Sequence, residues 1–218
     1  AKLENVWFKC YKEISNVNFA VSNIENVSGL SEEEKDKLKA EALFFRAFNY
    51  FYLVRNFGGV PLITEAYDGL DNIYVPRATV KEIYTLIEED LLFATKVGLP
   101  NKAFTKSGFR ITQGAVDMLL ADVYLNMSGY PLLEDHYEDA AKYSRKIIKD
   151  AQHSLLSHDN FEEASAYNKI RKLDNTDEYI YTFEYNNETF SNGDRGKYAI
   201  PSVSASWGIF KYGNTNIP

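Results

Sequence analysis

The sequence predicts an all-α fold of helical hairpins, with a short β element and long loops toward the C-terminus. Apolar residues recur at spacings of three and four over the N-terminal two-thirds of the chain, which indicates helices. Two Ser/Thr-x-x-Glu motifs mark helix starts. After residue 186 no period is sustained, and Gly, Asn and Ser become frequent. We therefore divide the chain into a helical region, 1–175, and the start of a loop-rich region, 176–218.

The first predicted helix covers about residues 3–27. Ser31 and Glu34 form a capping box that opens the second, because the hydroxyl can accept from a backbone N–H while the carboxylate reaches back. Between residues 42 and 54 this helix is apolar on nearly every face, which predicts that it packs between other helices. Gly58-Gly59 is the expected C-terminal cap.

A second capping box, Thr79 with Glu82, opens the third helix. Thr112 is a good N-cap for the fourth, and the fifth is expected over residues 135–151. Small and aromatic residues in the last two helices resemble the pattern of a tetratricopeptide (TPR) hairpin with a longer connection. Residues 179–185 alternate β-branched and aromatic side chains, which predicts a strand.

Composition excludes several functional classes. The chain of 218 residues has 24 Lys and Arg against 31 Asp and Glu, a formal charge of −7. An acidic chain is a poor partner for nucleic acid or an anionic membrane surface. A single cysteine, Cys10, excludes a disulfide framework, and the three histidines suggest no metal site. We expect no cofactor and no metal.

No targeting or membrane-spanning segment is visible. Residues 1–6 have neither the basic nor the apolar part of a signal peptide. The apolar run from 42 to 54 is interrupted by Arg46 and is shorter than the roughly 20 residues of a membrane span. Both a cytoplasmic protein and a mature chain without its leader are compatible with this pattern.

Arg46 lies within the most apolar stretch of the sequence. An unpaired buried charge is very costly, so this cation is expected to pair with a carboxylate. Asp90 and Asp122 are predicted on inward faces of neighbouring helices and are the expected partners. We interpret all three as structural buried charges rather than ligand-binding residues.

Short strings of residues follow one another in order between residues 7 and 185. They are AEALFFRA at 40–47, YFYL at 50–53, NFGGVPL at 56–62, PRAT at 76–79, RIT at 110–112, LADVYL at 120–125 and DEYIY at 177–181. In this order they resemble the SusD/RagB family. The ordered set carries the resemblance, and no single string would be decisive.

The resemblance implies a non-enzymatic, glycan-binding lipoprotein on the outer face of a Gram-negative outer membrane. Such proteins deliver oligosaccharides to a TonB-dependent, SusC-like transporter. Family members are more than twice this length, so the sequence is interpreted as an N-terminal portion, with 176–218 as the start of the ligand-binding region. The family's anchoring cysteine lies at the mature N-terminus, whereas Cys10 falls within a predicted helix. We therefore expect Cys10 to be a core residue, and membrane contact only through a lipid anchor absent from this chain.

Aromatic residues make up 15% of the chain, and those outside the predicted helical core are candidate sugar contacts. Flat rings can cover the C–H face of a sugar, and planar polar groups can bind its hydroxyls. The candidates after residue 186 are Phe190, Asp194, Arg195, Tyr198, Trp207, Tyr212 and Asn214. Tyr67 and Tyr74 lie in the predicted loop 62–76 and could contact sugar or transporter. All these rings could instead pack loops against helices.

Three functions remain open at this point. The first is the glycan-binding subunit, favoured by the ordered strings. The second is a TPR-like protein–protein adaptor without its own sugar site, which the helical pattern alone would support. The third is an all-helical glycosidase, but no pair of carboxylates is marked for that chemistry, and no catalytic residue is predicted. Starch, mucin glycan, plant polysaccharide and peptide cargo are all compatible with the sequence.

Overall fold

The computed structural model describes residues 2–66, 69, 74–101, 104–105, 108–150, 152–157, 166 and 177–181. The described elements are α1 (Lys2–Asn23), η1 (Ile24–Asn26), α2 (Glu32–Phe57), α3 (Val80–Ala94), β1 (Phe104–Thr105), β2 (Gly108–Phe109), α4 (Gln113–Met127) and α5 (Tyr137–Lys149). The predicted all-α class is confirmed. The chain divides into a compact unit, 1–181, and a second unit, 182–218, which lies outside the described residues. The predicted boundary at residue 175 stays a prediction.

The helix starts follow from local side-chain chemistry. The Ser31 hydroxyl accepts from the Glu34 N–H at 3.3 Å, and the Glu34 carboxylate accepts from the Ser31 N–H at 2.9 Å. Thr79 and Glu82 form the same reciprocal pair at 3.2 and 2.7 Å. The Thr112 hydroxyl caps α4. All three predicted caps are confirmed, because each depends only on residues within one turn.

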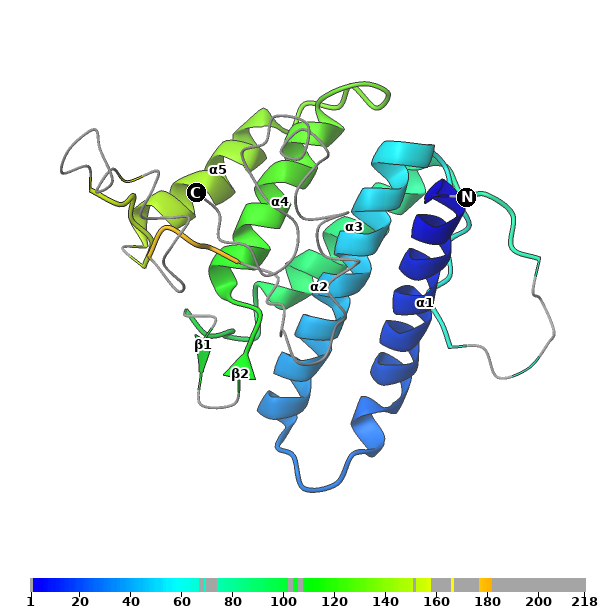
Figure 1. Cartoon of the computed structure of the whole chain (residues 1–218), viewed down its shortest axis with the longest axis horizontal. Coiled ribbons are helices and arrows are strands. Elements are labelled where there is room, and N and C mark those ends of the chain that lie inside the picture. The colour runs from blue at the N-terminus through cyan, green and yellow to red at the C-terminus, as the bar shows by residue number, and fades with distance from the viewer. Residues whose placement is uncertain are drawn as a thin grey trace, which may run out of the picture. The chain divides into compact units, whose positions relative to one another are not determined.

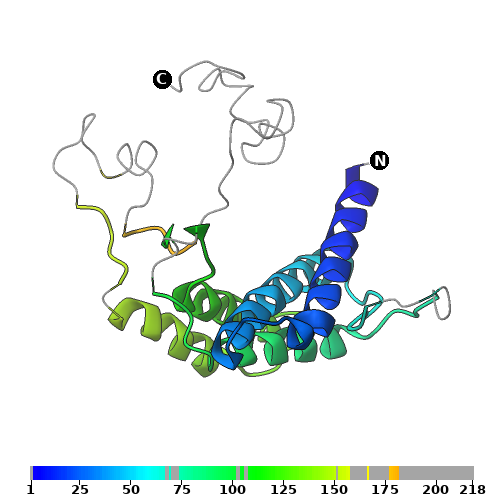
Figure 2. The same ribbon diagram turned by 90° about the horizontal axis from the view of Figure 1, so that it is seen from below.

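Each described α-helix packs against the α-helix that follows it in the sequence. Figure 1 shows α1 and α2 running antiparallel, as α4 and α5 do, with α3 between the two pairs. Figure 2 shows α1 and α5 at opposite ends of this row. Along α2 the rings of Phe44, Tyr50 and Phe51 are almost fully buried, so the predicted packing of α2 between other helices is confirmed.

Two sequence expectations on local structure are wrong. Residues 179–181 are irregular rather than a strand, and 182–185 lie outside the described residues. The Tyr181 ring packs against Phe44 with ring centroids 6.0 Å apart, so its aromatic character serves the helical core. The short β element is instead the antiparallel pair β1 and β2. The spacing of apolar residues in the predicted helix 135–151 also places Ile148 on its inward face, but Ile148 is 77% exposed, because it lies about 140° around α5 from the buried Tyr143.

The buried side chains of these helices form one core. Cys10 is buried in it, as expected for a core residue, and burial raises the pKa of its thiol. Among the helices that the structure describes, none has the length and apolar content needed to cross a membrane.

Candidate functional site

Most of the predicted sugar contacts lie in parts of the chain that the structure does not describe. These residues are Tyr67, Phe190, Asp194, Arg195, Tyr198, Trp207, Tyr212 and Asn214. They stay predictions. Tyr74 is described, and its side chain is 92% exposed.

Arg46 is buried and is held by side chains from two neighbouring helices. Its Nε and Nη2 donate to the two carboxylate oxygens of Asp90 on α3, at 2.8 and 2.7 Å. Its Nη1 donates to Asn18 Oδ1 on α1 at 2.9 Å and to the Thr64 carbonyl oxygen at 3.1 Å. A bidentate pair with further hydrogen bonds compensates the desolvation of both ions.

The expectation that Asp122 faces inward and pairs with Arg46 is wrong. Its side chain is 48% exposed and lies 3.7 Å from Arg55 Nη1. On α4 the buried carboxylate is Asp117, five residues earlier. The difference arises because α4 is apolar on several faces, so the sequence does not fix which face points inward.

Four side chains from α1 and α2 hold the backbone of residues 61–65. We name them the loop anchor: Tyr11, Asn18, Arg46 and Tyr50. The Tyr11 hydroxyl donates to the Pro61 carbonyl oxygen at 2.7 Å, and Arg46 reaches that of Thr64. Asn18 Nδ2 donates to the carbonyl oxygens of Ile63 and Glu65 at 2.9 and 3.3 Å. The Tyr50 hydroxyl accepts from the Ile63 N–H at 2.7 Å and donates to the Ile63 carbonyl oxygen at 3.0 Å.

The loop anchor fixes the chain where it enters the loop that carries Tyr74. Part-buried backbone polar groups need partners, and here side chains supply them instead of regular secondary structure. Sequence reasoning missed this cluster apart from Arg46. A signal was present for Asn18, which lies four residues after the buried Ile14 and so on the inward face of α1.

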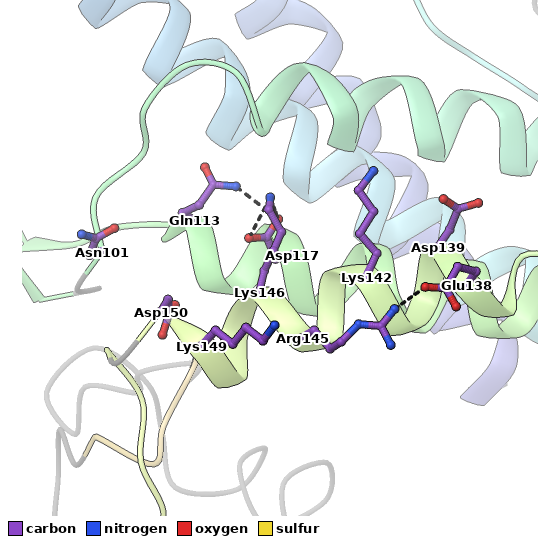
Figure 3. A pocket seen from close by; sticks show the side chains of 10 residues that line it. All are labelled: Asn101, Gln113, Asp117, Glu138, Asp139, Lys142, Arg145, Lys146, Lys149 and Asp150. Atoms are coloured by element: carbon purple, nitrogen blue, oxygen red, sulfur yellow. Dashed lines mark hydrogen bonds and ion pairs between the residues drawn. The ribbon is translucent and has the colours of Figure 1, made fainter.

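A charged groove of about 630 Å³ runs along α4 and α5. Figure 3 shows Lys146 of α5 against Asp117 of α4, with Lys142, Arg145 and Lys149 at other positions along α5. Lys146 Nζ lies 3.1 and 3.4 Å from the two Asp117 oxygens, and Arg145 forms an ion pair with Glu138 on its own helix. The charges of this α4–α5 groove are therefore largely compensated among themselves. No group of three or more metal-ligating side chains is found among the described residues.

A second, smaller pocket of about 460 Å³ lies beside the N-terminal half of α2. We name it the Glu41–Arg110 pocket after the ion pair that lines it, in which Arg110 Nε donates to Glu41 Oε1 at 2.8 Å. Burial raises the pKa of Glu41, and the hydrogen bond and charge of Arg110 offset this only in part. Leu30, Leu38 and Pro100 supply apolar walls.

The N-terminal part of this chain matches a known protein family. Residues 1–125 match the family described as "Starch-binding associating with outer membrane". The chain belongs to this SusD-like family. The SusD-like match takes in α1, α2, α3 and most of α4, and therefore contains the whole loop anchor. The α5 cations of the α4–α5 groove lie outside it.

Relatives and solved structures agree with this assignment. The SusD-like protein P2 of Formosa agariphila is 28% identical over 192 residues, which cover 86% of this chain and 35% of that protein. The structure of a SusD superfamily protein from Parabacteroides distasonis is 40% identical with a TM-score of 0.66, and the match covers 71% of this chain and 33% of that one. A structure described as "with xylogluco-oligosaccharide" is 29% identical with a TM-score of 0.63, covering 72% and 31%. This SusD-like chain thus spans about a third of the length of these relatives.

Proposed function

We propose that this chain belongs to a cell-surface subunit that binds oligosaccharide or polysaccharide. The subunit works with a TonB-dependent, SusC-like transporter in the outer membrane, and it is held there by a lipid anchor. Family membership and the relative with xylogluco-oligosaccharide support a glycan as ligand. The transporter and the anchor follow from the resemblance to the SusD/RagB family.

The observation that carries the proposal is the exposed ring of Tyr74 beyond a fixed stretch of backbone. Residues 61–65 are held by the loop anchor, and Tyr74 is 92% exposed. An exposed tyrosine offers an apolar face for the C–H side of a sugar and a hydroxyl for its polar groups. A fixed base reduces the conformational entropy that is lost when a ligand binds at Tyr74.

A binding role also agrees with the chemistry of the buried carboxylates. Asp90 is paired with Arg46, and Asp117 is paired with Lys146. Both are thus held as the structural partners of cations rather than positioned for acid–base exchange with a substrate. We therefore propose binding without catalysis.

Affinity electrophoresis of the chain against a polysaccharide panel tests the proposal. The panel contains xyloglucan, starch and mucin glycan, and a gel without polysaccharide gives the reference mobility. We expect at least one polysaccharide to retard the chain. The variant Tyr74→Ala should bind about tenfold more weakly, since partial burial of a ring contributes on the order of 1.4 kcal/mol.

Tyr130→Ala is the matched control, because Tyr130 is 88% exposed on the connection between α4 and α5. It should leave the retardation unchanged. If no polysaccharide retards the chain, or if both variants weaken binding equally, the proposal of glycan binding through Tyr74 is wrong. A chain that binds the transporter but no glycan would instead be a TPR-like protein–protein adaptor.

A further inference from the structure

The Glu41–Arg110 pocket is separate from the loop that carries Tyr74. Glu41 precedes Tyr50 of the loop anchor by nine residues, which is about 13 Å along α2. The pocket volume of about 460 Å³ is within the range of small-molecule sites. Nothing in the proposed function uses this pocket.

The ion pair inside the pocket uses one Glu41 oxygen and two Arg110 nitrogens. Arg110 Nε donates to Glu41 Oε1 at 2.8 Å, and Arg110 Nη2 lies 2.8 Å from the same oxygen. Among the described residues, none forms a hydrogen bond with Glu41 Oε2 or Arg110 Nη1. The Glu41 side chain is 17% exposed and that of Arg110 is 28% exposed, so both remain in reach of solvent.

The polar atoms of the pair can bind hydroxyl groups of a ligand. One hydroxyl can donate to Glu41 Oε2 while another accepts from Arg110 Nη1, because a hydroxyl can do either. The apolar walls made by Leu30, Leu38 and Pro100 fit the C–H surface of the same molecule. Several hydroxyl groups and a C–H face in one molecule are typical of a sugar ring.

The pair also selects against charged ligands. An anion would compete with Glu41 for Arg110, and a cation would compete with Arg110 for Glu41. Either exchange would leave a half-buried charge without its partner, which is strongly unfavourable. A neutral ligand can use Glu41 Oε2 and Arg110 Nη1 without breaking the ion pair.

We propose that the Glu41–Arg110 pocket is a second binding site, for a neutral sugar ring. The proposal goes beyond the proposed function, because it adds a ligand contact on the helical scaffold away from Tyr74. Arg110 and Glu41 bind hydroxyl groups of the sugar, and the apolar walls bind the C–H face of its ring.

Backbone amide NMR of the whole chain tests this site, with a xylogluco-oligosaccharide as the probe. We expect saturable shifts at the amides of Leu38 and Gly98, which line the pocket. The double variant Glu41→Leu/Arg110→Met keeps the volume of the pair and removes its polar atoms, so these shifts should disappear. Asp117→Leu/Lys146→Met makes the same exchange in the α4–α5 groove and should leave them unchanged.

Two further measurements keep the outcome decisive. Arg110→Lys retains the positive charge but lacks the planar guanidinium group, so we expect at least tenfold weaker sugar binding, measured from the amide shifts of Leu38 and Gly98. This single variant tests the site even if the double variant fails to fold. A galacturonate oligosaccharide should give no shift at these amides, because it is an anion. Equal shifts with this anion would overturn the neutral-ligand proposal.

The result is distinguishable from a failure of the proposed function. With Tyr74→Ala the shifts at Leu38 and Gly98 should persist. If the intact chain is retarded by a polysaccharide but shows no saturable shift there, the pocket proposal is wrong and the proposed function stands. Shifts at Leu38 and Gly98 that persist in a folded Glu41→Leu/Arg110→Met variant would also overturn the pocket proposal. If neither method detects any glycan, both proposals fail.

Discussion

Arg46 on α2 donates to both carboxylate oxygens of Asp90 on α3, at 2.8 and 2.7 Å. The same guanidinium also donates to the Thr64 carbonyl oxygen at 3.1 Å. One buried cation therefore joins two helices of the core and also holds the backbone that leads into the loop with Tyr74. Core stability and loop position depend on the same side chain.

Arg46→Ala should destabilise the chain by about 3–5 kcal/mol, because it leaves the buried Asp90 without its partner. Urea unfolding followed by circular dichroism measures this change. The double variant Arg46→Met/Asp90→Leu removes both charges and should lose much less stability. Asp122→Ala is the control, and its exposed position predicts a change within about 0.5 kcal/mol. Lost glycan binding without lost stability in Arg46→Ala would contradict a structural role.

Gly59→Ala should destabilise the turn after α2. A Cβ at this position would lie 2.3 Å from the Ala78 carbonyl oxygen, and the Ala78 N–H donates to the Val60 carbonyl oxygen at 2.9 Å. The two backbone segments would have to separate, at a cost of about 1–3 kcal/mol. At Gly129 the nearest atom would be 3.4 Å away, so Gly129→Ala serves as the control in the same thermal-unfolding measurement. Similar melting temperatures for the two variants would refute the close approach.

Tyr50→Phe should loosen the loop anchor while the ring stays in place. It removes the hydroxyl that both accepts from and donates to Ile63, so we expect a loss of about 1–3 kcal/mol. Hydrogen exchange of the Ile63 amide should become faster. Tyr124→Phe removes a hydroxyl bonded to Glu88 at 2.6 Å elsewhere in the core, and it should leave that amide unchanged. Unaltered exchange at Ile63 in Tyr50→Phe would show that other groups hold the segment.

The capping box of α3 predicts a pH dependence of stability. Hydrogen bonds from Thr79 lower the pKa of Glu82 below its usual value of 4.5. The folded state therefore binds fewer protons at Glu82 than the unfolded state does. The stabilisation is present above the unfolded pKa and is lost as the pH falls through the lower, folded pKa.

Glu82→Gln tests this dependence, because glutamine can accept the same hydrogen bonds without titrating. Melting temperatures at neutral and acidic pH should show a smaller decrease for the variant than for the natural sequence. An identical decrease in both would mean that Glu82 contributes nothing to the pH dependence.

The sequence predicted the features that depend on nearby residues. Capping boxes and the burial of Arg46 follow from patterns within a few turns of one helix. To predict which of Asp90 and Asp122 pairs with Arg46, one must know which face of α4 points inward. The sequence of α4 does not show this, because its apolar residues are spread over several faces. The predicted strand at 179–181 failed because Tyr181 packs against Phe44, and no local pattern shows this.

The candidate site was less predictable than the fold. The loop anchor binds backbone carbonyl oxygens of residues 61–65, and these are the same in every residue type. No sequence pattern therefore points to them. The Glu41–Arg110 pair joins residues 69 positions apart, and only the folded chain brings them together.

The packing of each described helix against its successor has a consequence for how the chain folds. Contacts between elements that are neighbours in the sequence close shorter stretches of chain than contacts between distant elements, and such closures cost less entropy. The α1–α2 hairpin can form while later residues are still being synthesised, and each new helix then finds its packing surface already in place.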